Sequence, residues 1–291
     1  MPDGALGCLR VLIEEISCPD LVTVAPDTDP LVRAIEANHV AFFSRFGRPP
    51  DGHVSTEGGI TRTVSGVCHP LFNGVFASTE PVEARAIDRT IAWFRMRELP
   101  FLWWVLPSQG PSGLDRRLEA SGLSHVFDAP GMVLRWDRLR KPSPGPEGLR
   151  IETVVDARSL ELFGQTLNAG DFEAPPSVAN EIPRLLRSDP DDPRTRCFLG
   201  FLGDEPVATS LRFVSDGAVG IYGIATVPSA RRRGIGAAMT VAALEDGRAA
   251  SGEPLAVLTA TDLGLPVYRR LGFEERCTFK AYTLRELAGS V

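Results

Sequence analysis

One short loop, between an expected strand and an expected helix, limits the possible folds of this chain most strongly. Residues 218–227 form an apolar run typical of a strand, and residues 237–248 form an alanine-rich run typical of a helix. Between them, three consecutive arginines precede Gly234 and Gly236. The first amides of a helix have no intrahelical acceptor, and the helix dipole favours negative charge there. Because glycines let phosphate oxygens approach the backbone, the segment predicts an anion-binding loop at the start of a helix.

Two familiar phosphate-binding loops do not fit these residues. A Walker loop requires Gly-Lys-Ser/Thr after the glycines, and no such sequence follows Gly236. The dinucleotide fingerprint Gly-x-Gly-x-x-Gly requires a third glycine where Met239 stands. An arginine- and glycine-containing segment is also an ordinary start for a surface helix, so the loop alone leaves both interpretations open.

The spacing Arg231-x-x-Gly234-x-Gly236 resembles the pyrophosphate loop of the GCN5-related N-acetyltransferase (GNAT) superfamily. A second segment, Tyr268-Arg-Arg-Leu-Gly-Phe, resembles the helix ending that follows this loop in the same family, and Gly272 is the expected helix-terminating glycine. The two motifs occur in the family's order and at its usual separation. The resemblance covers roughly residues 149–284.

The resemblance implies an α/β (α+β) fold with a mixed, mainly antiparallel sheet flanked by helices. The patterns within 149–291 agree with the family's order of elements. The expected strands are 149–154, 196–202, 207–214, 218–227, 255–260 and 277–284, and the expected helices are 157–168, 177–187, 237–248 and a helix ending at Leu271.

A proline- and glycine-rich segment, 141–148, divides the chain almost evenly and is expected to be a linker. We expect a first domain over 1–140 and a second over 149–291. Gly74 corresponds to Gly223 and Gly122 to Gly272, at offsets of 149 and 150 residues, and an apolar run lies between the two glycines in each half. This self-similarity favours a duplicated, acetyltransferase-like unit. Two unrelated α/β domains remain the alternative.

The first copy is expected to be degenerate. Where the second half has its arginines and glycines, residues 81–88 contain no glycine. Glu80, Glu83 and Asp88 would put negative charge where a pyrophosphate would lie, which is unfavourable. We expect this half not to bind coenzyme A in the same way, and to cover or shape the substrate side of the other domain.

For the second half, the resemblance implies acetyl-CoA as the acyl donor. The backbone of Ile224, Ala225 and Thr226 would hold the pantetheine arm like an added strand. Main-chain amides would hold the pyrophosphate, and the arginine side chains could reach the 3′-phosphate. The residues of this loop are Arg231, Arg232, Arg233, Gly234, Ile235, Gly236 and Ala237.

The resemblance also implies catalytic roles. The backbone N–H of Thr226 would stabilise the carbonyl oxygen as it gains charge. Tyr268 would protonate the thiolate leaving group as a general acid, or would merely pack against the coenzyme. Residues 218–227 contain no acid that could serve as the base. Asp171 and Glu173 could face the substrate, or could be solvated loop acids.

All four histidines, His39, His53, His69 and His125, lie in the first half. His39 or His69 could reach the site only across the interface between the halves, and a structural role is the simpler interpretation. Cys197 lies in an apolar strand and is expected in the core. The aromatic residues of the first half are expected to pack in the core, with an apolar substrate tunnel as the alternative; they are Phe72, Phe76, Trp103 and Trp104.

Composition limits the partners and the compartment. With a net charge of −6, the chain shows no nucleic-acid surface, and no apolar run is long enough to cross a bilayer. The start of the sequence does not resemble a signal peptide. The five scattered cysteines indicate reduced thiols and no zinc site. We expect a cytoplasmic protein without a metal.

The sequence therefore predicts an N-acetyltransferase that moves an acetyl group to a primary amine in a ternary complex, with a small-molecule or peptide acceptor. Two alternatives remain: a non-catalytic acyl-CoA-binding regulator, and a transferase for a longer acyl chain. The identity of the acceptor and the oligomeric state are left open.

Overall fold

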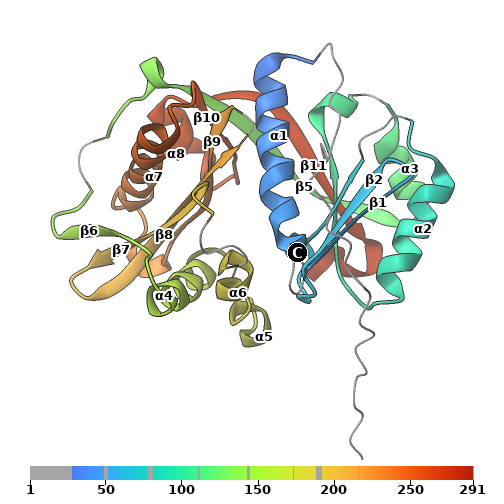
Figure 1. The fold of residues 1–291 in the computed structure, drawn as a ribbon, viewed down its shortest axis with the longest axis horizontal. Helices are drawn as coiled ribbons and strands as arrows, with labels where there is room; N and C mark the ends of the chain where they lie inside the picture. The colour runs from blue at the N-terminus through green and yellow to red at the C-terminus, as the bar shows by residue number, and fades with distance from the viewer. Residues whose placement is uncertain are drawn as a thin grey trace, which may run out of the picture.

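The computed structural model describes residues 28–48, 52–77, 81–110, 112–142, 145–172, 174–187, 192–215 and 217–290. These residues form one sheet with helices on both faces (Figure 1). The strands are β1 His53–Glu57, β2 Ile60–Val64, β3 Asn73–Ala77, β4 Leu102–Val105, β5 Leu123–Arg135, β6 Leu149–Thr153, β7 Thr195–Leu202, β8 Glu205–Ser215, β9 Ala218–Thr226, β10 Leu255–Thr259 and β11 Glu274–Leu284. The helices are α1 Pro30–Ser44, α2 Ala84–Arg95, α3 Leu114–Ala120, α4 Ala157–Leu167, α5 Pro176–Ala179, α6 Ile182–Arg187, α7 Ile235–Ser251 and α8 Leu265–Leu271.

The sheet has the order β1-β2-β3-β4-β11-β5-β10-β9-β8-β7-β6. Among the described residues only β3 with β4 and β9 with β10 pair in parallel, and the other neighbours are antiparallel. The mixed, mainly antiparallel sheet predicted from the sequence is therefore confirmed. No helix in the described ranges combines the length and the apolar character that crossing a membrane requires.

The two halves of the chain exchange their last strands. β5, from the first half, lies between β10 and β11 of the second half. β11, from the second half, lies between β4 and β5 of the first. One sheet thus runs through both halves, and each half completes the sheet of the other. The domain boundaries drawn from the sequence, 1–140 and 149–291, stay a prediction.

The two halves repeat the same order of elements. In the first, β3, α2, β4, α3 and β5 follow one another along the chain, and in the second the order is β9, α7, β10, α8 and β11. In both halves the two shorter strands are parallel neighbours, and the final strand is long and antiparallel. The repeat offset seen in the sequence thus relates elements of the same type.

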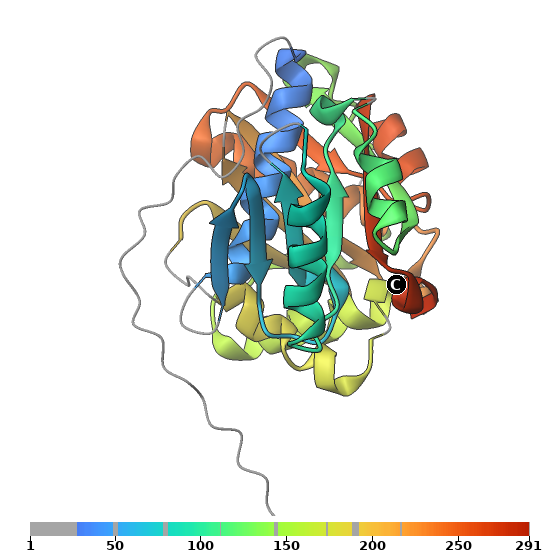
Figure 2. The ribbon, with the colours of Figure 1, turned by 90° about the vertical axis from the view of Figure 1, so that its right-hand side faces the viewer.

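Helix α1 joins the halves on one face of the sheet. It packs with α4 over a single core cluster that includes Phe42, Phe76, Phe163 and Tyr222. The opposite face has two clusters, one under α7 and α8 and one under α2 and α3. Figure 1 shows α1 between the two halves, and Figure 2 shows α2 and α3 covering the first half. Asn38 at the centre of α1 accepts a hydrogen bond from Tyr222 Oη at 2.8 Å, which ties this helix to β9.

Helix ends follow local sequence signals. Gly272 adopts φ +103° and ends α8, as predicted, with Phe273 N donating to the carbonyl of Tyr268. The helix predicted over 177–187 is instead two short helices, α5 and α6. Pro183 explains the break, because a proline inside a helix has no N–H to donate and clashes with the preceding turn.

Candidate active site

Strand β9 contains one extra residue opposite β8. Thr209 pairs with Ala225 but Leu211 pairs with Tyr222, so a bulge lies between them. Gly223 adopts φ +55° there, and its carbonyl accepts a hydrogen bond from Thr209 Oγ1 at 2.8 Å. A residue with a side chain would be strained in this conformation. Because a bulge bends its strand, β9 changes direction at Gly223.

Beyond the first part of β9, its pairing with β10 stops. The two strands pair from Ala218 opposite Leu255 to Gly220 opposite Val257, and no further pair joins them in the described residues. β10 continues to Thr259, but there it pairs only with β5. The stretch of β9 from 221 to 226 therefore presents an open edge.

The backbone direction along this edge follows from one hydrogen bond. Val227 N donates to the carbonyl of Val207, on the β8 side. Because backbone groups alternate between the two sides of a strand, those of Ala225 also face β8. Those of Ile224 and Thr226 face the open edge. A ligand lying along β9 would meet the N–H and carbonyl groups of Ile224 and the N–H of Thr226, whose carbonyl already accepts a hydrogen bond from Arg231 Nε.

The open edge leads to the start of α7. Gly234, with φ +81°, is the N-terminal cap of this helix. The amide of Arg231 donates to the carbonyl of Pro228, but the amides of 232–237 have no acceptor in the part of the chain that the structure describes. A Cβ on Gly236 would lie 3.7 Å from Thr226 Oγ1, and one on Gly234 would meet no atom within 4 Å. Six free N–H groups thus lie next to the end of β9.

The three arginines of this loop differ in their surroundings. Arg231 Nε donates to the carbonyl of Thr226, and its Nη2 donates to the carbonyl of Gly170, both at 3.0 Å. Its side chain therefore ties β9 to the turn that follows α4. Arg232 and Arg233 are exposed, so their charge remains available to a ligand. Sequence reasoning did not anticipate this role of Arg231.

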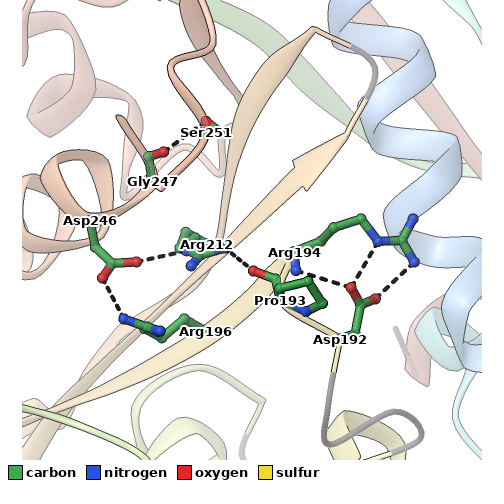
Figure 3. A network of polar contacts seen from close by, with 8 residues as sticks. All are labelled: Asp192, Pro193, Arg194, Arg196, Arg212, Asp246, Gly247 and Ser251. Carbon is green, nitrogen blue, oxygen red and sulfur yellow. Dashed lines mark hydrogen bonds and ion pairs between the residues drawn. The ribbon is translucent and has the colours of Figure 1, made fainter. Parts of the chain in front are cut away.

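A buried ion pair fixes α7 on the sheet (Figure 3). Asp246 of α7 accepts hydrogen bonds from Arg212 Nε at 2.7 Å and from Arg196 Nη1 at 2.9 Å. Arg212 also donates to the carbonyl of Pro193. One residue further, Gly247 packs directly on Val219 of β9, where a Cβ would clash. These contacts hold the helix that carries the free amides.

Tyr268 lies on α8 and its ring is buried, with 8% of the residue exposed. It packs edge-on against Phe273, with ring centroids 5.9 Å apart, and its ring lies against Gly264. The hydroxyl has no hydrogen-bond partner among the described residues, and it is not fully enclosed by protein atoms. Burial raises the pKa of Tyr268, and the negative charge of Asp171 raises it further. The phenol stays protonated and can donate.

Asp171 belongs to a π-helical turn, Asn168–Phe172, that lies against the end of β9. A Cβ on Gly170 would lie 3.0–3.1 Å from Ala225 and from the backbone of Thr226. Asp171 as a residue is exposed to solvent, although neighbouring atoms partly surround its carboxyl. Partial burial raises the pKa of its carboxyl, and the positive charge of Arg231 lowers it. The structure thus places the turn that carries Asp171 beside Thr226, and Asp171 is near enough to Tyr268 for its charge to raise the pKa of the phenol. Glu173 lies outside the described residues.

The histidines lie elsewhere. His39 is buried among Phe43, Trp104 and Phe279, and burial lowers its pKa to about 3. His69 accepts a hydrogen bond from Leu71 N and caps a short turn. His53 is exposed on β1, and His125 pairs with Asp128 at 2.8 Å.

The remaining sequence candidates are part of the core. Burial raises the pKa of the Cys197 thiol to about 12. The aromatic residues predicted to pack in the core do so; they are Phe72, Phe76, Trp103 and Trp104. No group of histidine, cysteine and acidic side chains in the described ranges could hold a metal ion.

The equivalent edge in the first half is paired. β2 and β3 pair without a register shift, so β3 has no bulge. β3 and β4 remain paired as far as Phe76 opposite Trp104. At the next residue, the carbonyl of Ala77 accepts a hydrogen bond from Gln109 Nε2 at 3.1 Å. The open edge of β9 has no counterpart here among the described residues.

Comparisons with known proteins agree with this geometry. Residues 215–276 match a family model described as an acetyltransferase (GNAT) domain. A GCN5-related N-acetyltransferase from Kribbella flavida has a similar structure, with a TM-score of 0.66 at 20% identity over 87% of this chain and 95% of that one. One from Sphaerobacter thermophilus has a TM-score of 0.59 at 16% identity, over 92% and 96%. No curated protein matches the chain.

A structure described as a tandem GNAT protein from the clavulanic acid biosynthesis pathway is also similar. Its TM-score is 0.57 at 13% identity, covering 90% of this chain and 97% of that one. At such identities these structures show the fold alone. The family model spans β9, the glycine loop, α7, β10 and α8, which together form the site described above. Residues 215–276 therefore match the GNAT acetyltransferase domain model, and the described residues have the fold of GNAT proteins that align with both halves of this chain.

Proposed function

We propose that this chain is an N-acetyltransferase that transfers the acetyl group of acetyl-CoA directly to a primary amine. The observation that carries the proposal is the open edge of β9 that leads to the six free amides of 232–237. An extended ligand with an anionic end fits such an arrangement: the edge offers hydrogen bonds as a neighbouring strand would, and the start of α7 favours negative charge.

Different residues of the site suit the pantetheine arm, the pyrophosphate and the 3′-phosphate of acetyl-CoA. Backbone groups of Ile224 and Thr226 would bind the pantetheine arm, and the alternation of the strand favours them over Ala225. The amides of 232–237 would bind the pyrophosphate. Arg232 and Arg233, which are exposed, would provide charge for the 3′-phosphate, while Arg231 holds the end of β9 in position.

The catalytic steps follow from charge changes at the reacting atoms. An alkyl ammonium has a pKa of about 10.4, so roughly one molecule in 2,500 is neutral at pH 7. The amine must lose a proton before it can attack the thioester carbonyl. The Thr226 N–H would stabilise the developing negative charge on the carbonyl oxygen. The Tyr268 hydroxyl, kept protonated by burial, would donate a proton to the departing sulfur.

We further propose that the first half is a degenerate copy that does not bind acetyl-CoA. Its equivalent strand β3 is paired with β4 as far as Phe76, and Gln109 occupies the next carbonyl. The backbone groups that would hold pantetheine are therefore already used. Its contribution to the second half is the strand β5, which completes the sheet beside β10.

Calorimetry with acetyl-CoA tests coenzyme binding. Gly234→Glu should weaken the affinity about tenfold or more, because a carboxylate would lie among the phosphate-binding amides. Gly203→Glu is the matched control, since Gly203 also has a positive φ and open space where a Cβ would lie. Its affinity should equal that of the wild type. Equal affinity in both variants would refute the phosphate site.

Thiol release from acetyl-CoA, measured with a panel of primary amines, tests the reaction. Turnover above the rate without amine supports the transferase. Tight coenzyme binding without turnover would instead favour the acyl-CoA-binding regulator. Affinities for acetyl-, butanoyl- and octanoyl-CoA, compared under the same conditions, show whether a longer acyl group is preferred.

A further inference from the structure

We propose that Asp171 is the catalytic base that takes a proton from the acceptor amine, and that Gly170 and Arg231 position it. This inference rests on the proposed function, since it assigns a residue to the step for which β9 itself provides no acid. Residues 218–226 contain neither an acid nor a histidine, and no histidine occurs in the chain after His125.

The position of Asp171 is fixed by its neighbours in the backbone. Gly170 lies so close to β9 that any Cβ would contact Ala225 and the backbone of Thr226 at 3.0–3.1 Å. The Arg231 guanidinium bridges the carbonyls of Gly170 and Thr226, each at 3.0 Å. Asn168 closes the turn from the other side, through hydrogen bonds to the backbone N–H and carbonyl of Ala174 at 2.9 and 3.2 Å. The turn is therefore tied to the end of the open edge.

The surroundings leave the carboxylate free to act. Asp171 is exposed and has no hydrogen bond or ion pair within the described residues. The donors of Arg231 are directed to the two carbonyls, so Arg231 lowers the pKa of Asp171 through its charge alone. The other titratable group that interacts with it is Tyr268, on the opposite element α8. The proposed base and acid therefore come from two different elements, the turn after α4 and helix α8.

Glu36 is the strongest competing acid, and its geometry excludes it. It is fully buried on α1, and its Oε1 accepts a hydrogen bond from Ser108 N. Its Oε2 is also enclosed, without a partner among the described residues. A substrate amine could not reach it without rearrangement of α1.

The proton balance is complete with these groups and water. The ammonium loses two protons as its nitrogen becomes an amide nitrogen. Asp171 accepts the first and releases it to solvent, and the neutral nitrogen then forms the bond to the carbonyl carbon. The C–S bond breaks, and the sulfur takes a proton from Tyr268. The second proton from the nitrogen restores Tyr268, so the overall reaction releases one proton.

The experiment compares two small acceptors in the full chain. Ethylamine is almost entirely protonated at pH 7.5, whereas hydroxylamine is mostly neutral and does not need the base. Asp171→Asn should lower kcat with ethylamine by about 10²-fold or more, and should lower it much less with hydroxylamine. The loss with ethylamine should diminish as the pH is raised. Affinity for acetyl-CoA should not change.

Three controls separate the possible causes. Asp204→Asn, on the exposed turn between β7 and β8, should behave as the wild type, and Asp171→Glu should retain part of the activity. Arg231→Met should lower kcat without a comparable loss of acetyl-CoA affinity. The proposal is overturned if Asp171→Asn is as active as the wild type, if both acceptors lose activity equally, or if Glu173→Gln alone gives the acceptor-dependent loss. Failure of the wild type to bind acetyl-CoA or to turn over any acceptor would instead count against the proposed function.

Discussion

Replacing Asp246 with alanine tests how firmly the sheet holds α7, the helix that presents the free amides. The Arg212 side chain is 2% exposed. In the variant it would keep its hydrogen bond to the carbonyl of Pro193 but lose its counter-charge. Removing one partner of a buried ion pair costs about 3–5 kcal/mol. The bond to Arg196, whose side chain is 48% exposed, contributes about 0.2–1 kcal/mol. Because Asp246 itself is 21% exposed, we expect the lower end, about 3 kcal/mol.

Urea denaturation, followed by both fluorescence and circular dichroism, measures the free energy of unfolding for each variant. Arg196→Met should cost at most about 1 kcal/mol. The double variant Asp246→Ala/Arg212→Met should be more stable than Asp246→Ala, because no unpaired charge stays buried. The reasoning is refuted if Asp246→Ala costs less than about 1 kcal/mol, or if the double variant is no more stable than the single one.

Three other changes test further parts of the molecule. Tyr268→Phe should lower kcat while leaving acetyl-CoA affinity unchanged. Turnover equal to that of the wild type would show that Tyr268 only packs in the core. His39 has a folded-state pKa of about 3 against 6.5 when unfolded, so the unfolded chain binds more protons between these values. Stability should therefore fall as the pH drops below 6.5, by about 2 kcal/mol between pH 7 and pH 5. His39→Phe should remove that part of the pH dependence. The same slope of unfolding free energy against pH in both proteins would contradict this prediction. Residues 145–291 alone lack β5, which separates β10 from β11, so they should aggregate or form oligomers; a stable, acetyl-CoA-binding monomer in sedimentation would refute this.

Local signals made the glycine loop at the start of α7 and the order of elements predictable. The glycine loop could be recognised because a positive φ at Gly234 and free amides at a helix start depend on neighbouring residues only. Gly272 ended its helix as expected for the same reason. The predicted strands of the second half have counterparts within a few residues, because alternation of apolar residues reports local burial.

Contacts between distant residues could not be predicted. The exchange of β5 and β11 depends on pairing across more than a hundred residues, and no pattern within either strand specifies its neighbour. Arg231 belongs to the loop in sequence, yet it serves as a bridge to Gly170 because the turn after α4 folds back on β9. Gly170 could have been singled out from the sequence, since it precedes an acidic residue in a loop. The reason for a glycine at this position is the close approach of its backbone to β9, which only the fold reveals.

Amide chemical shifts upon titration with acetyl-CoA test the central claim most directly. We predict large changes at Ile224, Thr226 and 232–237, together with slower hydrogen exchange of these amides once the ligand is bound. The equivalent amides of β3, Val75 and Ala77, should not change. Changes concentrated in β3, or no change at the loop at saturating acetyl-CoA, would contradict the account.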